Sequence, residues 1–211
     1  MYRILIYDNY SIIHVLAIPY TDNSIRQHCV AGPITMEAVV TAQPWANTID
    51  VVTLPGKALK EVLEHSVSQY DASHPDPGGR FLQLSGLIVK YNEAAPTGSR
   101  LVQVKVGQPD DQAGWSDVDD DALYEVAMSS FMVKGGDGYQ MIPDNLREHR
   151  NTGFLDNDLF VSYLKKNDPL TLPSEGRIKI VSQEYTADGM AIMPSFSGVS
   201  LLSLILSICA L

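Results

Sequence analysis

FMVKGGDGYQMI, residues Phe131 to Ile142, is the stretch on which the fold assignment rests. It follows an apolar, β-rich run and contains three glycines within four positions. Because glycine has no Cβ, the backbone there can turn sharply and approach a bound ligand closely. Asp137 lies among these glycines, and its carboxylate can accept two hydrogen bonds from a vicinal diol such as that of a ribose. The alternative is an ordinary turn at a strand end, in which the aspartate caps its own loop.

The composition predicts one acidic globular domain. The chain has 211 residues, 45% hydrophobic content and a formal net charge of -10, with a sequence pI near 4.8. This is enough apolar material for one sizeable core. The acidic balance argues against binding to nucleic acid, because clustered Lys and Arg drive that binding, whereas a small phosphorylated ligand needs only a local cation. Two cysteines, Cys29 and Cys209, indicate no disulfide framework.

Hydrophobic periodicity predicts a mixture of helices and strands. Helices are expected where apolar residues recur at helical spacing, and strands where β-branched and aromatic residues cluster. The expected helices span residues 35–43, beginning at a capping threonine, 57–70 and 156–166. The expected strands span residues 48–54, 81–91, 101–106, 123–132 and 176–181. This order predicts an α/β or mixed α+β domain of about 150 residues, with a mixed sheet and flanking helices.

Several short segments agree in order with a known family. They are GPIT at 32–35, QPW at 43–45, LPG at 54–56, EHSV at 64–67, FLQ at 81–83 and EGRI at 175–178. Together with the Gly-Gly-Asp-Gly segment and the following QMI, they make the chain resemble the C-terminal domain of the 5'-nucleotidase family, which includes ecto-5'-nucleotidases and apyrase-like enzymes. The resemblance runs from Ser24 to about Val181. It implies a single substrate-binding domain over residues 24–185, after a divergent or truncated segment over residues 1–23.

The resemblance also implies which residues bind the substrate. In this family, the nucleotide base is sandwiched between two aromatic rings, and the matching positions here are Trp45 and Phe131. Stacking on each ring contributes on the order of 1 to 3 kcal/mol, by analogy with nucleic-acid bases. Gly135, Gly136 and Asp137 complete the expected substrate-binding loop. The alternative is that the two aromatic residues belong to the core.

Arg26 matches the family's arginine that helps to hold the phosphate. A guanidinium suits this role because it offers two parallel donors to phosphate oxygens. The surrounding motif is incomplete, since Thr21 to Asn23 stand where the family has Asn-Gly-Gly, and Ser130 stands where an asparagine is usual. We therefore expect a truncated or altered sequence before Ser24. The alternative for Arg26 is a solvated surface residue.

The sequence contains no recognisable catalytic centre. In the family, hydrolysis is carried out by an N-terminal metallophosphoesterase domain with two divalent metals of the zinc type, which polarise the phosphate and generate hydroxide. The five histidines here lack metal-ligand spacing. The acidic run from Asp117 to Asp121 is interpreted as a solvated loop, since it lacks the glycine and glutamate of a calcium loop. We predict no catalytic residue, metal or cofactor in this chain, and no hydrolysis by the chain alone.

Residues 186–211 resemble a signal for a glycosylphosphatidylinositol (GPI) anchor. Ala187 to Gly189 are small residues, a short spacer follows, and Val199 to Leu211 are almost wholly apolar. The apolar run is too short to span a bilayer comfortably. We expect a protein on the extracellular face of the plasma membrane, or a secreted one. The alternative is a packed or disordered tail.

Together these observations predict the nucleotide-binding portion of an extracellular 5'-nucleotidase, which hydrolyses nucleoside phosphates to nucleoside and phosphate in nucleotide catabolism. The expected partners are a nucleoside monophosphate or related nucleotide, the N-terminal domain, and a membrane through the lipid anchor. A homodimer, which some relatives form, stays open. Two alternatives also stay open: a catalytically inert nucleotide-binding or interaction module, and a non-functional partial product. Base preference and the number of phosphates in the substrate are undecided.

Overall fold

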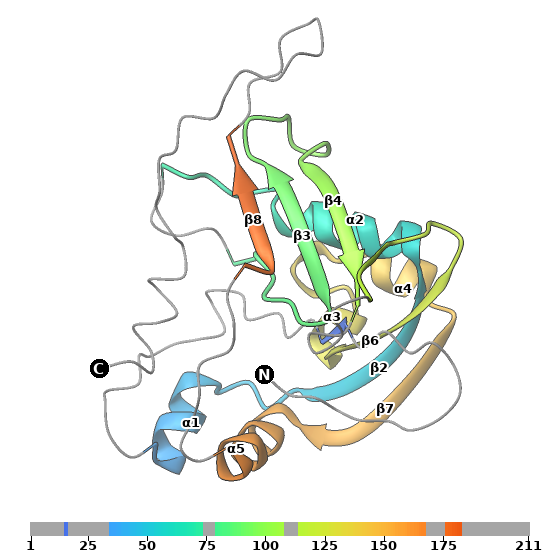
Figure 1. The fold of residues 1–211 in the computed structure, drawn as a ribbon. Helices are drawn as coiled ribbons and strands as arrows, with labels where there is room; N and C mark the ends of the chain where they lie inside the picture. The colour runs from blue at the N-terminus through green and yellow to red at the C-terminus, as the bar shows by residue number, and fades with distance from the viewer. Residues whose placement is uncertain (1–14, 17–33, 74–78, 108–113, 168–175, 183–211) are drawn as a thin grey trace, which may run out of the picture.

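The computed structural model describes residues 15–16, 34–73, 79–107, 114–167 and 176–182 (Figure 1). These residues form two four-stranded sheets. The first has the order β1 (Val15–Leu16), β6 (Leu123–Ser129), β2 (Thr48–Pro55) and β7 (Glu148–Leu155). The second has the order β5 (Ser116–Asp117), β4 (Leu101–Val106), β3 (Leu87–Asn92) and β8 (Ile178–Val181). Strands β1 and β6 are parallel, as are β3 and β8, and the other pairs are antiparallel. The predicted mixed α/β fold is confirmed.

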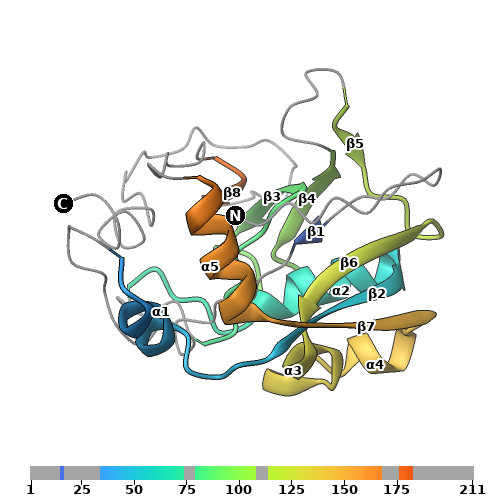
Figure 2. The same cartoon turned by 90° about the horizontal axis from the view of Figure 1, so that it is seen from below.

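The helices connect and cover these sheets. They are α1 (Met36–Ala42), α2 (Gly56–Ser66), α3 (Ser130–Val133), α4 (Met141–Asn145) and α5 (Asp156–Lys166), with one 3-10 turn over Gly136–Gly138. Helix α1 packs against α5 near the point where β2 begins, as Figure 2 shows. Thr35 caps α1 as expected, because its hydroxyl accepts a hydrogen bond from the Ala38 amide at 3.1 Å.

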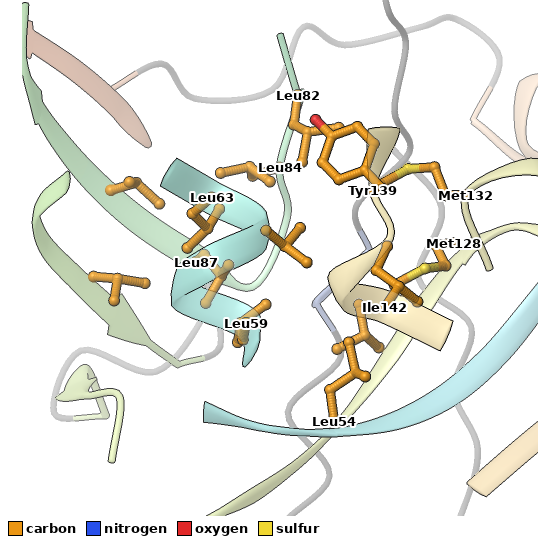
Figure 3. Close-up of a cluster of buried hydrophobic side chains, with 14 of the residues drawn as sticks. Leu54, Leu59, Leu63, Leu82, Leu84, Leu87, Met128, Met132, Tyr139 and Ile142 are labelled. Carbon is orange, nitrogen blue, oxygen red and sulfur yellow. The ribbon is translucent and has the colours of Figure 1, made fainter. Parts of the chain in front are cut away.

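Helix α2 lies between the two sheets and joins them into one core. Its apolar side chains Leu59, Val62 and Leu63 are buried in a cluster that also contains residues from β2 and β6 on one side and from β3 and β4 on the other. Figure 3 shows Leu59 and Leu63 of this helix in the cluster, together with Leu87 and Leu54 from the two sheets. Burying such side chains contributes roughly 1.5 to 3 kcal/mol each. The domain therefore has one shared core rather than one core for each sheet.

The first turn of α2 is held by the acidic loop that precedes β6. The amides of Gly56 and Lys57 donate to the carbonyl oxygens of Ala122 and Asp120, at 2.9 and 3.0 Å. The Lys60 ammonium also pairs with the Asp120 carboxylate at 2.6 Å. The run from Asp117 to Asp121, expected to be a solvated loop, is exposed except at Val118, but Asp117 belongs to strand β5. The backbone of the loop that follows also satisfies amides that a helix N-terminus leaves without partners.

Several predicted boundaries are corrected by the structure. The strand expected over 81–91 begins only at Leu87, because Phe81, Leu82 and Leu84 pack individually into the core and Gly86 adopts a left-handed conformation with φ 76°. The strand expected over 123–132 ends at Ser129, whose hydroxyl accepts a hydrogen bond from the Met132 amide and so begins α3. Helix α2 ends at Ser66 rather than residue 70. The strand over 101–106 and the helix over 156–166 are confirmed.

Strand β7 was not predicted from the sequence. It lies at one edge of the first sheet, and every residue in it except Thr152 is exposed. An exposed edge strand shows no apolar alternation, so the period-2 pattern that identifies a half-buried strand is missing. The strand is held instead by polar contacts: the Thr152 hydroxyl donates to the Ile49 carbonyl oxygen, and His149 Nε2 lies 2.7 Å from the carboxylate of the buried Asp50.

Gly56→Ala should destabilise the domain by about 3 kcal/mol, because overpacking in a close-packed site costs 1 to 3 kcal/mol or more. A Cβ at position 56 would lie 1.9 Å from the carbonyl oxygen of Asp119, and that backbone also holds the start of α2. Urea unfolding followed by circular dichroism measures the change. Gly98→Ala is the matched control, since nothing lies within 4 Å of its Cβ position and only its left-handed conformation opposes the substitution. Equal losses in the two variants would contradict the packing argument.

Candidate functional site

The two aromatic residues expected to stack on the base lie at the same end of one strand pair. Strands β2 and β6 are antiparallel, with Ile49 opposite Ser129. Trp45 lies four residues before Ile49 in the loop after α1, and Phe131 lies two residues after Ser129 in α3. Trp45 is 54% exposed and Phe131 is 47% exposed. The alternative in which both rings belong to the core is therefore wrong.

The loop that carries Trp45 is held at both ends. At its start, the Gln43 amide donates to the Val39 carbonyl oxygen at 2.9 Å and so ends α1. At its end, the Asn47 carbonyl oxygen accepts a hydrogen bond from the Asp156 amide at 2.9 Å, which ties the loop to the start of α5. Between these points, Ala46 adopts a left-handed conformation with φ 49°. Non-glycine residues are uncommon in this region, so the tight turn after Trp45 is imposed by its surroundings.

Phe131 packs directly over Gly136. A Cβ built at Gly136 would lie 2.4 Å from the Cε1 and Cζ atoms of the Phe131 ring, a separation that real atoms do not adopt. Glycine at position 136 therefore leaves the space that the exposed ring occupies. The structure thus places the Phe131 ring directly against the glycine-rich loop.

The glycine-rich loop turns twice in left-handed conformations. Gly135 has φ 82° and Gly138 has φ 84°, which glycine adopts without steric cost. Asp137 between them has φ 53°, in a region that costs a residue with a Cβ about 1 kcal/mol or more. Two backbone bonds close the loop, from the Gly135 amide to the Met132 carbonyl at 2.8 Å and from the Tyr139 amide to the Gly136 carbonyl at 3.1 Å.

The Asp137 side chain is exposed and does not cap its own loop. Within the ranges that the structure describes, its carboxylate forms no hydrogen bond or ion pair, and only its backbone carbonyl accepts a bond, from His65 Nε2 at 3.0 Å. The alternative of a self-capping aspartate is not observed. Two carboxylate oxygens are thus left to accept hydrogen bonds from a ligand.

A buried tyrosine anchors the loop to the core. Tyr139 is fully buried, and its hydroxyl donates to the Arg80 carbonyl oxygen at 2.5 Å. Burial raises the pKa of Tyr139, so the phenol keeps the proton that this bond requires. Figure 3 shows its ring between Leu82 and Met132. His65 meets the same ring edge-on, with ring centroids 4.7 Å apart and planes at 76°.

Sequence reasoning missed the roles of His65, Arg80 and Tyr139. His65 lies in the EHSV segment and Arg80 directly precedes the FLQ segment, and neither segment indicates by its residue types a contact with the glycine-rich loop. No spacing in the sequence connects residue 65 with residue 137. An aromatic residue directly after the Gly-Asp-Gly turn is the one feature of the sequence that indicates an anchor for the loop. It does not identify which residues the tyrosine contacts.

The predicted phosphate ligand, Arg26, lies outside the described residues, as do residues 1–14 of the N-terminal segment and residues 186–211 of the tail. Among the residues that the structure describes, no three His, Cys, Asp or Glu side chains lie together in a way that could hold a metal ion. In the same residues, no helix has the length and apolar character needed to cross a bilayer.

The structure thus defines a two-sheet α/β domain with exposed aromatic residues and a strained glycine-rich loop at one end of a sheet. Residues 15–144 match the model of the family described as 5'-nucleotidase, C-terminal domain. The chain belongs to this family.

Similar proteins agree with this assignment. An apyrase of Tabanus yao is 34% identical over 158 residues, which cover 74% of this chain and 28% of that protein. A 5'-nucleotidase of Rattus norvegicus is 35% identical over 172 residues, covering 81% of this chain and 29% of that protein. The crystal structure of a 5'-nucleotidase precursor from Thermus thermophilus superimposes with a TM-score of 0.69 and 34% identity, over 79% of this chain and 31% of that one. The chain therefore spans less than a third of the length of these relatives.

Gly136→Ala should displace the Phe131 ring, because the new methyl group would occupy the position of the ring edge. The aromatic resonances of Phe131 in a ¹³C–¹H NMR spectrum report its position, and we expect them to shift while the fold is retained. Gly153→Ala is the control, since nothing lies within 4 Å of its Cβ position. Unchanged Phe131 resonances in the Gly136 variant would mean that the ring does not pack on this glycine in solution.

Proposed function

We propose that this chain is the nucleotide-binding portion of an extracellular 5'-nucleotidase, and that it binds nucleosides and nucleoside monophosphates through Trp45, Phe131 and Asp137. The observation that carries the proposal is the exposure of two large aromatic rings at the end of the β2 and β6 pair, next to a carboxylate without a protein partner in the described residues. Exposed rings offer stacking faces to any base, and the carboxylate suits the ribose diol.

The expected base selectivity is weak. Stacking depends on the π-face that every base has, whereas discrimination between bases requires hydrogen bonds to their edges. In this proposal Asp137 forms hydrogen bonds with the sugar, and the two aromatic rings stack on the base. Adenosine, guanosine and inosine should therefore bind with similar affinities, and the ribose should contribute more to selectivity than the base.

Hydrolysis is proposed for the longer protein rather than for this chain. Two relatives that are called 5'-nucleotidase and apyrase are more than three times the length that this chain covers in them. We propose that two divalent metals of the zinc type, held by a preceding metallophosphoesterase domain, supply the hydroxide and polarise the phosphate. Arg26 would contribute phosphate binding from this chain. Residues 186–211 would supply the lipid anchor that keeps the protein on the outer face of the membrane.

Phe131→Ala should weaken adenosine binding about tenfold, because loss of one stacked contact costs on the order of 1 to 3 kcal/mol. Fluorescence titration of the 211-residue chain measures the affinity, in a Trp115→Phe background that leaves Trp45 as the only tryptophan. Leu123→Ala is the matched control: Leu123 is 57% exposed and lies opposite Pro55, at the other end of the same strand pair. Equal affinities of the Phe131 and Leu123 variants would refute stacking on Phe131.

The same titration with AMP, combined with a phosphate-release assay in added zinc, separates binding from hydrolysis. Saturable binding without phosphate release is the expected result. Phosphate release by the purified chain would contradict the placement of the catalytic metals in the rest of the longer protein. A wild-type chain that binds neither ligand at millimolar concentration would remove the binding proposal itself.

Asp137→Ala should abolish discrimination between adenosine and 2',3'-dideoxyadenosine. The wild-type chain should bind adenosine about tenfold more tightly, since hydrogen bonds to a charged group contribute roughly 1.5 to 3 kcal/mol. In the variant, both ligands should bind with the weaker affinity. The ratio of the two dissociation constants is measured by competition. A wild-type ratio near one would show that the carboxylate does not contact the diol.

A further inference from the structure

The strained backbone of Asp137 needs a partner that holds it. Within the described residues, Asp137 and Ala46 are the non-glycine residues with positive φ angles. Such a conformation persists only where the surrounding structure over-determines it, and it occurs often at ligand-binding positions. The turn of Asp137 sets where its carboxylate projects from the loop. Whatever holds this turn therefore also sets the geometry with which the carboxylate meets a ligand.

His65 contacts the backbone of this turn directly. Its Nε2 atom lies 3.0 Å from the Asp137 carbonyl oxygen. A carbonyl oxygen can only accept, so Nε2 carries the proton and donates it, in the neutral tautomer or in the imidazolium. The loop passes close to the ring: a Cβ at Gly138 would lie 3.2 Å from Cε1 and Nε2. The edge-on contact with Tyr139 fixes the ring from another side.

The end of α2 makes His65 a rigid support. Its neighbour Glu64 accepts backbone hydrogen bonds from Gly98, Arg100 and Leu101, at 3.0, 2.9 and 2.6 Å. On its other side, Ser66 is buried and donates to the Leu63 carbonyl oxygen at 2.6 Å. The backbone of His65 is therefore held between two residues that are bonded into the second sheet and the core. A side chain whose backbone is held in this way can fix the conformation of a loop that contacts it, because the loop must adapt to the side chain.

We propose that His65 is a positioning residue, which holds the Asp137 backbone in the conformation that presents its carboxylate to the ribose diol. The proposal rests on the nucleoside-binding function proposed above. His65 acts through the main chain of Asp137 and requires no contact with the ligand. Its closeness to Gly138 also explains why a glycine follows the aspartate, since any side chain there would press on the imidazole.

The test compares His65→Ala, His65→Gln and Glu61→Ala in the 211-residue chain. Glutamine places an amide donor near the position of Nε2, so it should restore the bond that alanine removes. Glu61 is an exposed residue of the same helix and serves as the control. His65→Ala should weaken adenosine binding about fivefold to tenfold, as expected for a lost hydrogen bond. The glutamine variant should stay within about threefold of the wild type, and the Glu61 variant should equal it.

Two further measurements separate positioning from general destabilisation. The Gly138 amide shares a peptide group with the Asp137 carbonyl, so its ¹⁵N resonance in the ligand-free protein should shift in the alanine variant and return in the glutamine variant. In an Asp137→Ala background, His65→Ala should cause no further loss of affinity, because the residue acts through Asp137.

The outcomes distinguish the two proposals. Wild-type affinity in His65→Ala, or equal losses in the alanine and glutamine variants, would overturn the positioning role. An additive loss in the double variant would overturn it as well. If the wild-type chain binds no nucleoside, the proposed function fails, and the Gly138 resonance still decides whether His65 holds the loop.

Discussion

The antiparallel register of β2 against β6 is the constraint on which the rest of this structure depends. Ile49 lies opposite Ser129 and Pro55 opposite Leu123, so the start of β2 and the end of β6 share one end of the sheet. A slip of one residue would put the side chains of one strand on the opposite face of the sheet from those of its partner, and burial of Val52, Leu54, Val126 and Met128 in the core with α2 opposes it. The same register carries the Trp45 loop and the Phe131 helix to the same end of the sheet. Core packing and the placement of the candidate site thus have one cause.

Three glycines serve this arrangement for different reasons. Gly56 lets the acidic loop approach the first turn of α2, where a Cβ would meet a carbonyl oxygen. Gly136 leaves space for an exposed aromatic ring, and Gly138 leaves space for an imidazole while also taking a left-handed conformation. In each case the limiting contact comes from a different part of the chain. These glycines are determined by tertiary packing as much as by the local turn.

In the candidate site, buried and half-buried residues hold the glycine-rich loop in place, and the side chains proposed to contact a ligand are exposed. Tyr139 and His65 tie the loop to the core and to α2, whereas Phe131, Trp45 and the Asp137 carboxylate remain accessible. Such an arrangement suits recognition, because little ordering is left for the ligand to impose. It also fits a chain that spans less than a third of its relatives' length. In the proposed function, this chain supplies binding groups, and the metals for hydrolysis belong to the rest of the longer protein.

The sequence by itself determined the fold class, the family and most elements with a clear hydrophobic period, such as the strand over 101–106 and the helix over 156–166. It also predicts a substrate-binding role for Phe131 and the glycine-rich loop, because both lie in one continuous motif, and this role stays a prediction. It did not predict β7, whose exposed residues carry no period, or the early end of β6, where a serine hydroxyl caps a short helix. Only the tertiary structure decided that Trp45 and Phe131 are exposed and that His65 contacts Asp137. Those facts depend on contacts between residues far apart in the chain, and local patterns do not record such contacts.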